Sequence, residues 1–212
     1  MTLTITAIPA LLETLSLNNC IVTLDAMGCQ KTIAGQILDR GADYLLVLKA
    51  NHSKAFLAVK ECCERHCFAR DATGKPVFDA FDDSHGRLVR RRVFVCPEAA
   101  ALKALDTWSG LRTVLAVETI RGVNGSGKVE AEIRYFLSSC HDDPTVLVQA
   151  IRRHWTIENG LHWVLDVTFR EDDSRVRDRT AARNLAILRK IAINLMGRDR
   201  MNRAGFTGGP IS

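Results

Sequence analysis

The 212-residue sequence has little of what a membrane, secreted or disordered protein would need. No apolar run approaches the roughly 18 residues of a membrane span, because charged residues interrupt the longest runs. The first ten residues have no cationic segment ahead of an apolar stretch, so they do not resemble a signal peptide. With 47% hydrophobic and 25% charged residues, the composition excludes disorder and collagen-like repeats. We therefore expect a soluble, cytoplasmic, globular protein with no membrane segment.

The seven cysteines lack the paired spacing of a disulfide framework. Their odd number and irregular spacing favour free thiols in a reducing compartment. Cys62, Cys63, His66 and Cys67 form a dense group that could recruit zinc. This group lacks the two separated ligand pairs that structural zinc sites usually show, so free thiols are the preferred interpretation.

Charge is distributed unevenly along the chain. Residues 152–212 carry 12 basic and 7 acidic side chains, whereas residues 1–151 carry 17 of each, so the C-terminal segment holds the whole excess of +5. A basic segment favours a polyanionic partner such as nucleic acid, although solvated helices often carry a similar excess. The charge alone is weak support for DNA binding.

Hydrophobic periodicity predicts a strand, a helix and a second strand after a short first helix over Thr6–Leu17. The β-branched run Ile21–Leu24 is typical of a buried strand, and so is Tyr44–Leu48. Between them, Gln30–Arg40 has apolar residues at helical spacing, and Gly41 is expected to end that helix. This order predicts a right-handed βαβ unit and an α/β fold class.

The middle of the chain predicts an antiparallel, β-rich insertion. It follows a helix over Ser53–Phe68, and a glycine-rich turn at 122–127 separates two of its strands. The predicted strands of the insertion are Leu88–Cys96, Arg112–Arg121 and Val129–Ser138. Two C-terminal helices are expected over Pro144–Leu165 and Thr180–Met196.

Asp25 follows a predicted buried strand. Ligands of open α/β sheets gather outside the carboxyl ends of strands, so Asp25 is well placed to hold a metal ion. A carboxylate at this place could equally cap the following helix. Both interpretations stay open from the sequence.

Glu158 lies in the predicted helix over Pro144–Leu165, with His154 four residues before it and His162 four residues after it on the same face. Apolar residues border that face, and a carboxylate beside apolar packing must be paired, protonated or metal-bound. Oxygen ligands suit Mg²⁺ or Mn²⁺. Salt bridges to Arg152 or Arg153 are the plain alternative.

Several runs of the chain, taken in order, resemble insertion-sequence transposases of the H-repeat-associated (ISAs-type) group in the DDE superfamily. The match covers nearly the whole chain, so it is far more specific than a lone motif. The matching runs are residues 21–30 (IVTLDAMGCQ), 41–51 (GADYLLVLKAN), 85–87 (HGR), 154–159 (HWTIEN) and 161–172 (LHWVLDVTFRED).

The resemblance implies an RNase H-like core in which three acids hold two divalent ions, with a β-rich insertion before the last acidic helix. It implies that Asp25 is the second acid and Glu158 the third, both catalytic and metal-binding, with Mg²⁺ or Mn²⁺ as cofactor. The implied segments are a partial core with the second acid (1–70), the β-rich insertion (71–143), C-terminal helices with the third acid (144–200) and a flexible tail (201–212).

The first catalytic Asp of the family has no counterpart in this sequence. It belongs upstream of the second acid, yet none of the 24 residues before Asp25 is an Asp, and Glu13 is a poor substitute. The chain therefore resembles the C-terminal part of a transposase, and we expect it to be inactive alone. An exposed sheet edge at residues 21–24 would favour oligomerisation.

The expected partner is DNA, as the terminal inverted repeats of a mobile element, with homo-oligomers or mixed oligomers with full-length transposase. The candidate DNA contacts are Arg152, Arg153, His154, His162, Arg175, Arg177 and Lys190. Lys49, Asn51 and Arg87 lie in matching runs without an assigned role. Two alternatives remain: a DNA-binding or partner-binding fragment that modulates full-length transposase, and a stand-alone metal nuclease completed by Asp166 or Asp172.

Overall fold

The structure is a computed structural model that describes residues 3–69, 72–84, 87–123, 129–140, 143–157, 164–171 and 173–198. The chain divides into two compact units, Met1–Ile151 and Arg152–Ser212. In the part that the structure describes, no helix is both long and apolar enough to cross a membrane.

The predicted βαβ unit is confirmed. Helix α1 (Leu3–Thr14) lies three residues before its predicted range. Strand β1 (Ile21–Leu24) has its predicted range, but its residues are half-buried and not buried as predicted. Helix α2 (Lys31–Asp39) is followed by Gly41, whose φ of +69° gives the left-handed turn that ends the helix. Strand β2 (Asp43–Leu48) then runs parallel to β1.

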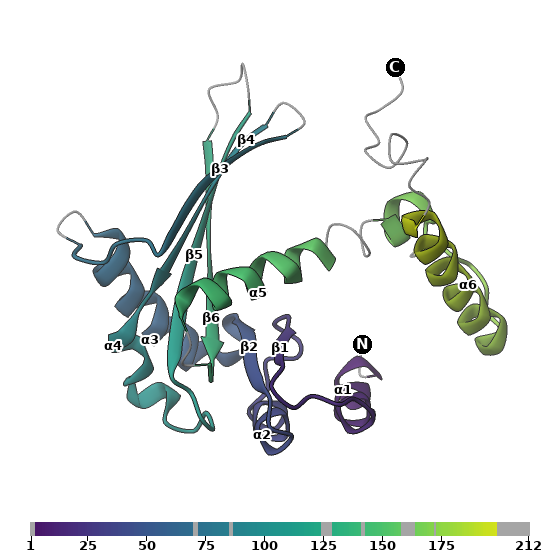
Figure 1. Ribbon diagram of the computed structural model, residues 1–212, viewed down its shortest axis with the longest axis horizontal. Helices are drawn as coiled ribbons and strands as arrows, with labels where there is room; N and C mark the ends of the chain where they lie inside the picture. Colours follow the sequence, from purple (N-terminus) through teal and green to yellow (C-terminus); the bar gives the residue numbers. More distant parts are fainter. Residues whose placement is uncertain are drawn as a thin grey trace. The chain divides into compact units, whose positions relative to one another are not determined.

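Six strands form a single, mostly antiparallel sheet in the order β1-β2-β6-β5-β4-β3 (Figure 1). Strands β2 and β6 pair antiparallel, with Leu45 opposite Ser138, so the β-rich segment continues the sheet of the βαβ unit. The four later strands are β3 (Phe78–Ser84), β4 (Arg87–Val95), β5 (Thr113–Val123) and β6 (Val129–Ser138). The three predicted strands of this segment are therefore confirmed.

Strand β3 was not predicted from the sequence. Its aspartates interrupt the apolar pattern, but cross-strand contacts with β4 stabilise it. The guanidinium of Arg90 donates to both carboxylate oxygens of Asp79, at 2.9 and 2.6 Å, and also lies over the ring of Phe81. On the same sheet, the Arg92 guanidinium pairs with the carboxylate of the buried Glu118 of β5.

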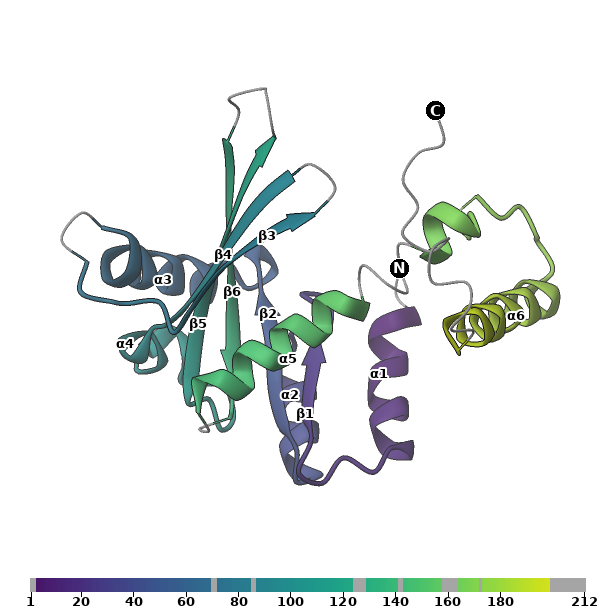
Figure 2. The same cartoon turned by 45° about the horizontal axis from the view of Figure 1, so that its top comes forward.

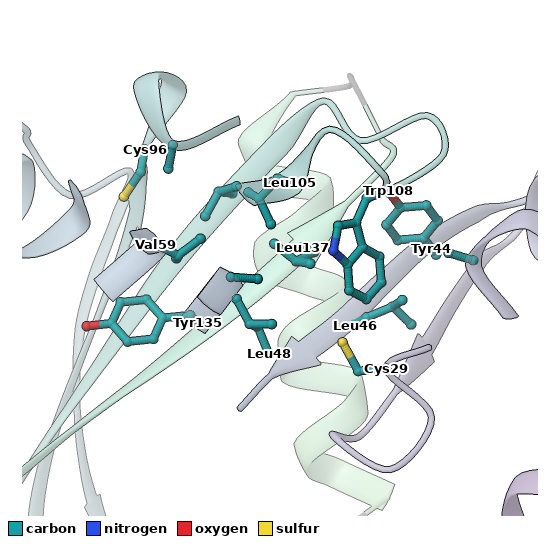
Figure 3. Packing of buried hydrophobic residues seen from close by; sticks show 14 of the residues in the cluster. Cys29, Tyr44, Leu46, Leu48, Val59, Cys96, Leu105, Trp108, Tyr135 and Leu137 are labelled. Atoms are coloured by element: carbon teal, nitrogen blue, oxygen red, sulfur yellow. The ribbon is translucent and has the colours of Figure 1, made fainter. Parts of the chain in front are cut away.

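The main core lies between one face of the sheet and the helices that cover it. Tyr44, Leu46 and Leu48 of β2 point into this core, where they meet Ile37 of α2 and Val59 of α3 (Ser53–Cys63). Figure 3 shows β2 side chains packed with Tyr135 and Leu137 of β6 and with Trp108. All of the labelled side chains are nearly inaccessible to solvent, which fixes the position of β2 and of the residues that follow it.

The other face of the sheet is covered by the first turns of α5 (Pro144–Ile157), which cross it in both views (Figures 1 and 2). Leu45 and Val47 alternate with the residues of the main core and are also buried. Leu147 and Ile151 of α5 are buried to 1% exposure. Strand β2 is therefore apolar on both faces, as its continuous apolar run predicts.

Short elements complete the first unit. They are 3-10 turns at Ala50–His52 and Lys103–Leu105, a π-helical turn at Glu64–Phe68 and helix α4 (Pro97–Ala100).

The second unit contains a π-helical turn at Val164–Thr168 and helix α6 (Arg179–Arg198). Helix α6 confirms the prediction for the last helix and extends it by one residue or two at each end. The helix predicted over Pro144–Leu165 is described as α5 up to Ile157, and residues 158–163 lie outside the described part. Within this unit, Arg189 pairs with Glu171 at 3.5 Å.

Candidate active site

Asp25 is the first residue after β1, at the carboxyl end of the parallel pair β1 and β2. Residues 25–30, called the Asp25 loop below, connect this strand to α2. The Asp25 side chain is exposed to solvent. The carboxyl ends of neighbouring parallel strands lie at the same edge of a sheet, which is where ligands of open α/β sheets gather.

Hydrogen bonds within the loop orient the Asp25 carboxylate. Its Oδ1 accepts the backbone N–H groups of Met27, at 3.1 Å, and Gly28, at 3.3 Å. The N-cap of α2 is Gln30, five residues later, so Asp25 does not cap that helix. The helix-capping interpretation of Asp25 is therefore wrong, because its carboxylate accepts N–H groups of its own loop and not those of α2.

Gly28 allows the loop to fold back closely against the strand. A Cβ atom at this position would lie 2.8 Å from the Cβ of Leu24, closer than real side chains approach each other. The backbone N–H of Gly28 also donates to the carbonyl of Asp25 at 3.1 Å. The tight turn that presents Asp25 thus requires glycine three residues after the acid.

Two residues after β2 contact the Asp25 loop. Nδ2 of Asn51 donates to the carbonyl oxygen of Ala26 at 3.0 Å, and Nε2 of His52 lies 2.6 Å from the carbonyl oxygen of Cys29. The His52 ring packs edge-on against Trp108, with centroids 5.3 Å apart. Asn51 had no assigned role in the sequence, and His52 was not singled out, because side-chain contacts between two loops leave no periodic signal.

Cys29 anchors the end of the Asp25 loop in the core. Its side chain is fully buried, next to Trp108 and Leu46 in Figure 3. Burial, with a smaller contribution from the Asp25 charge, raises the pKa of the Cys29 thiol from 9.0 to about 12. At neutral pH this thiol is protonated, so it packs as a small apolar group and does not act as a nucleophile.

The described residues hold part of the expected metal-binding set. Asp25 offers an exposed, oriented carboxylate, and hard oxygen donors of this kind suit Mg²⁺. Glu158, His162 and Asp172 lie outside the described residues. Asp166 is described and exposed in the second unit. Within the described ranges, no three His, Cys, Asp or Glu side chains are grouped to hold an ion.

The cysteine group around α3 does not form such a site either, and all seven cysteines are free thiols. Cys67 Sγ lies 3.3 Å from Cys96 Sγ in the core, and this contact, together with burial, raises the pKa of the Cys67 thiol. The pKa of the Cys96 thiol is raised by its contact with Cys63 and by burial, although the contact with Cys67 lowers it. His66 pairs instead with Glu98, at 2.9 Å. Free thiols remain the better interpretation of this cluster.

Most candidate DNA contacts are on solvent-exposed positions. Lys49, at the end of β2, is exposed as well, and Arg87 is the first residue of β4. Arg152 and Arg153 are exposed on α5, where His154 is half-buried, Arg175 and Arg177 are exposed before α6, and Lys190 is exposed on α6.

The described structure is thus a mixed α/β fold in which the exposed Asp25 follows a parallel strand. The family model of the Transposase DDE domain matches residues 4–195, and the chain belongs to this family.

Curated relatives agree with this family. The chain is 37% identical over 208 residues to the "H repeat-associated putative transposase YhhI" of Escherichia coli (strain K12), covering 95% of this chain and 54% of the relative. "Putative protein YbfL" of the same strain has the same identity and coverage, and "Putative transposase YncI" of Escherichia coli O157:H7 is 39% identical over 196 residues, covering 91% of this chain and 49% of the relative. The chain spans about half the length of these relatives. No solved structure matches.

Proposed function

We propose that this chain provides the second and third acids of a DDE transposase site, with Asp25 and Glu158 as ligands of Mg²⁺ or Mn²⁺ in an RNase H-like core. The observation that carries the proposal is the geometry of Asp25. In a chain of the Transposase DDE domain family, this exposed carboxylate directly follows a parallel strand, and two backbone N–H groups orient it. Such preorganisation is what a metal-holding carboxylate needs.

Each residue of the proposed site has a role that follows from its side chain. The Oδ1 atom of Asp25 accepts the hydrogen bonds of its own turn, and its Oδ2 atom would bind an ion. Glu158 would bind from its helix, where His154 and His162 orient the carboxylate or contact a phosphate. When bound, divalent ions would activate a water or a 3′-hydroxyl and stabilise the leaving oxygen in phosphodiester cleavage.

The substrate of this chemistry is proposed to be DNA at the ends of a mobile element. Exposed cations would contact the phosphate backbone, which gives a salt-sensitive affinity with little sequence preference. These residues are Arg152, Arg153, Arg175, Arg177 and Lys190, all of them exposed.

The 212-residue polypeptide by itself is expected to bind ions weakly and to leave DNA uncut. Two of three carboxylates would be present, and the 24 residues before Asp25 contain no Asp. Removing one ligand from a shared two-ion site disturbs the geometry that both ions need.

The test combines plasmid nicking with Mn²⁺ binding on the 212-residue polypeptide. We expect no nicking of plasmids that carry inverted repeats, in Mg²⁺ or in Mn²⁺. In ¹⁵N spectra, Mn²⁺ should broaden the amides of residues 25–28, and Asp25→Asn should abolish this effect. Glu158→Gln should weaken it, because the two acids would share the ions.

Two results would contradict this proposal. Nicking that Glu158→Ala abolishes would show that the chain is a complete metal nuclease. Mn²⁺ broadening that is unchanged in Asp25→Asn would show that this carboxylate is no ligand.

A second candidate function is partner binding. Strand β1 stands at one end of the sheet and pairs with β2 on its inner side. Another strand could extend the sheet at β1, either from a second copy of this chain or from full-length transposase. Such a fragment would modulate transposition by forming mixed oligomers.

A further inference from the structure

The Asp25 loop is held from outside by the residues that follow the neighbouring strand. Asn51 and His52, called the clamp pair below, bind the carbonyl oxygens of Ala26 and Cys29, at 3.0 and 2.6 Å. We infer that Asn51 and His52 are positioning residues that fix the Asp25 carboxylate for metal binding. This inference rests on the proposed function of Asp25.

The two contacts bracket the turn that carries the acid. Ala26 lies directly after Asp25, and Cys29 is the last residue before the N-cap of α2. Between them, the N–H groups of Met27 and Gly28 donate to Asp25 Oδ1. Contacts at the carbonyl groups of Ala26 and Cys29 therefore hold the segment whose N–H groups orient the Asp25 carboxylate. An exposed loop without such contacts would open easily, and an opened turn would lose both amide bonds to the carboxylate.

The clamp pair is itself anchored to the core. The backbone N–H of His52 donates to the carbonyl oxygen of Lys49 at 3.1 Å. The His52 ring packs against Trp108 at an interplanar angle of 74°. Trp108 is only 4% exposed. His52 therefore connects the Asp25 loop to the same core in which β2 packs. Mutation of groups that orient a metal ligand through hydrogen bonds commonly weakens metal affinity.

Asn51 and His52 differ in a way that makes the inference testable. Asn51 is exposed and, in the described part of the chain, its side chain makes one hydrogen bond, to Ala26, so Asn51→Ala removes little besides that hydrogen bond. His52→Ala also removes the packing on Trp108. His52→Gln keeps an amide Nε2 that reaches the same carbonyl, so it tests the hydrogen bond without emptying the position.

The experiment measures amide exchange and Mn²⁺ broadening on the ¹⁵N-labelled 212-residue chain. In Asn51→Ala, the amides of Met27 and Gly28 should exchange about fivefold faster, the factor expected from losing one hydrogen bond. The Mn²⁺ concentration needed for half-broadening should rise by a similar factor. His52→Ala should show the same changes, and His52→Gln should restore most of the wild-type behaviour. Lys54→Ala, an exposed change on α3, is the matched control and should change neither measurement.

The possible outcomes separate the clamp from the metal site. If Asn51→Ala and His52→Ala leave both measurements unchanged while Asp25→Asn abolishes broadening, the clamp is refuted and the proposed function of Asp25 stands. If exchange accelerates in both clamp variants but Mn²⁺ broadens nothing in the wild type, the pair holds the loop and the metal role of Asp25 fails. Equal effects in His52→Gln and His52→Ala would show that packing on Trp108, and not the hydrogen bond, holds the loop.

Discussion

Gly28 and Gly35 lie seven residues apart, one in the Asp25 loop and one within α2, and they have opposite surroundings. A Cβ at Gly28 would meet Leu24 at 2.8 Å, whereas a Cβ at Gly35 would meet no atom within 4 Å apart from its chain neighbours and the backbone of its own helix. The Leu24 Cβ is attached directly to its backbone, so it cannot rotate away. The loop must therefore shift if Gly28 acquires a side chain.

Gly28→Ala should lower the free energy of unfolding by about 1–3 kcal/mol, the usual cost of forced overpacking. Gly35→Ala should raise it by roughly 0.5–1 kcal/mol, because alanine has the higher helix propensity. Urea titrations of both variants against the wild type measure these differences. Equal stability of the two variants would show that the Asp25 loop has room to relax.

At the scale of single residues, the sequence pointed to Asp25 but not to Asn51 and His52, which contact its loop. Asp25 was singled out because the β-branched, apolar run before it predicts a strand, and the end of that strand can be read from the residue types. The contacts of Asn51 and His52 with the Asp25 loop depend on the parallel pairing of β1 and β2 and on one turn after β2. Such contacts carry no local spacing, so only the three-dimensional arrangement reveals them.

At the scale of elements, strand β1 is the end of the sheet. Its residues are half-buried, and its pairing partner is β2. If a second chain extends the sheet here, the amides of residues 21–24 should become more protected from hydrogen exchange as protein concentration rises. Analytical ultracentrifugation should show a dimer over the same concentrations. The amides of α2 serve as an internal control, since their hydrogen bonds lie within the helix.

A monomer at every concentration, with constant exchange at residues 21–24, would argue against partner binding through β1. A dimer that forms without added protection there would place the interface on another surface.

Strand prediction succeeded or failed according to burial. Strands β4, β5 and β6 have apolar runs that pack in the core, and the sequence predicted each of them within a few residues. Strand β3 lies at the other end of the sheet and depends on the Asp79–Arg90 pair and on Phe81 beneath that guanidinium. Stabilisation by cross-strand contacts is a property of two segments together, so the pattern of one segment could not predict it.

At the scale of the whole molecule, several buried groups ionise with difficulty. Burial raises the pKa of Cys29 from 9.0 to about 12, and the pKa values of Tyr44 and Tyr135 are raised by burial as well. The unfolded chain therefore loses these protons at a lower pH than the folded chain does. The contribution of these groups to the free energy of unfolding is fully present below about pH 9. It decreases as the pH rises toward the pKa values that the groups have in the folded protein.

Urea midpoints measured with a reducing agent from about pH 7 to pH 11 should be constant at first and then decrease. Cys29→Ala should reduce the slope of that decrease, because one of the contributing groups is gone. A midpoint that stays constant up to pH 11 would show that these groups are solvated in the folded protein.

The sheet that joins distant parts of the chain also governs the order in which the protein can form on the ribosome. Strand β2 meets β1 soon after synthesis, but its other edge waits for β6, with Leu45 opposite Ser138 and roughly 90 residues between them. At about 5–20 residues per second, translation takes roughly 5–20 seconds to supply that partner. During this interval an apolar strand is complete and uncovered on one side. The nascent chain thus exposes apolar surface that the finished protein buries, and such transient exposure favours aggregation.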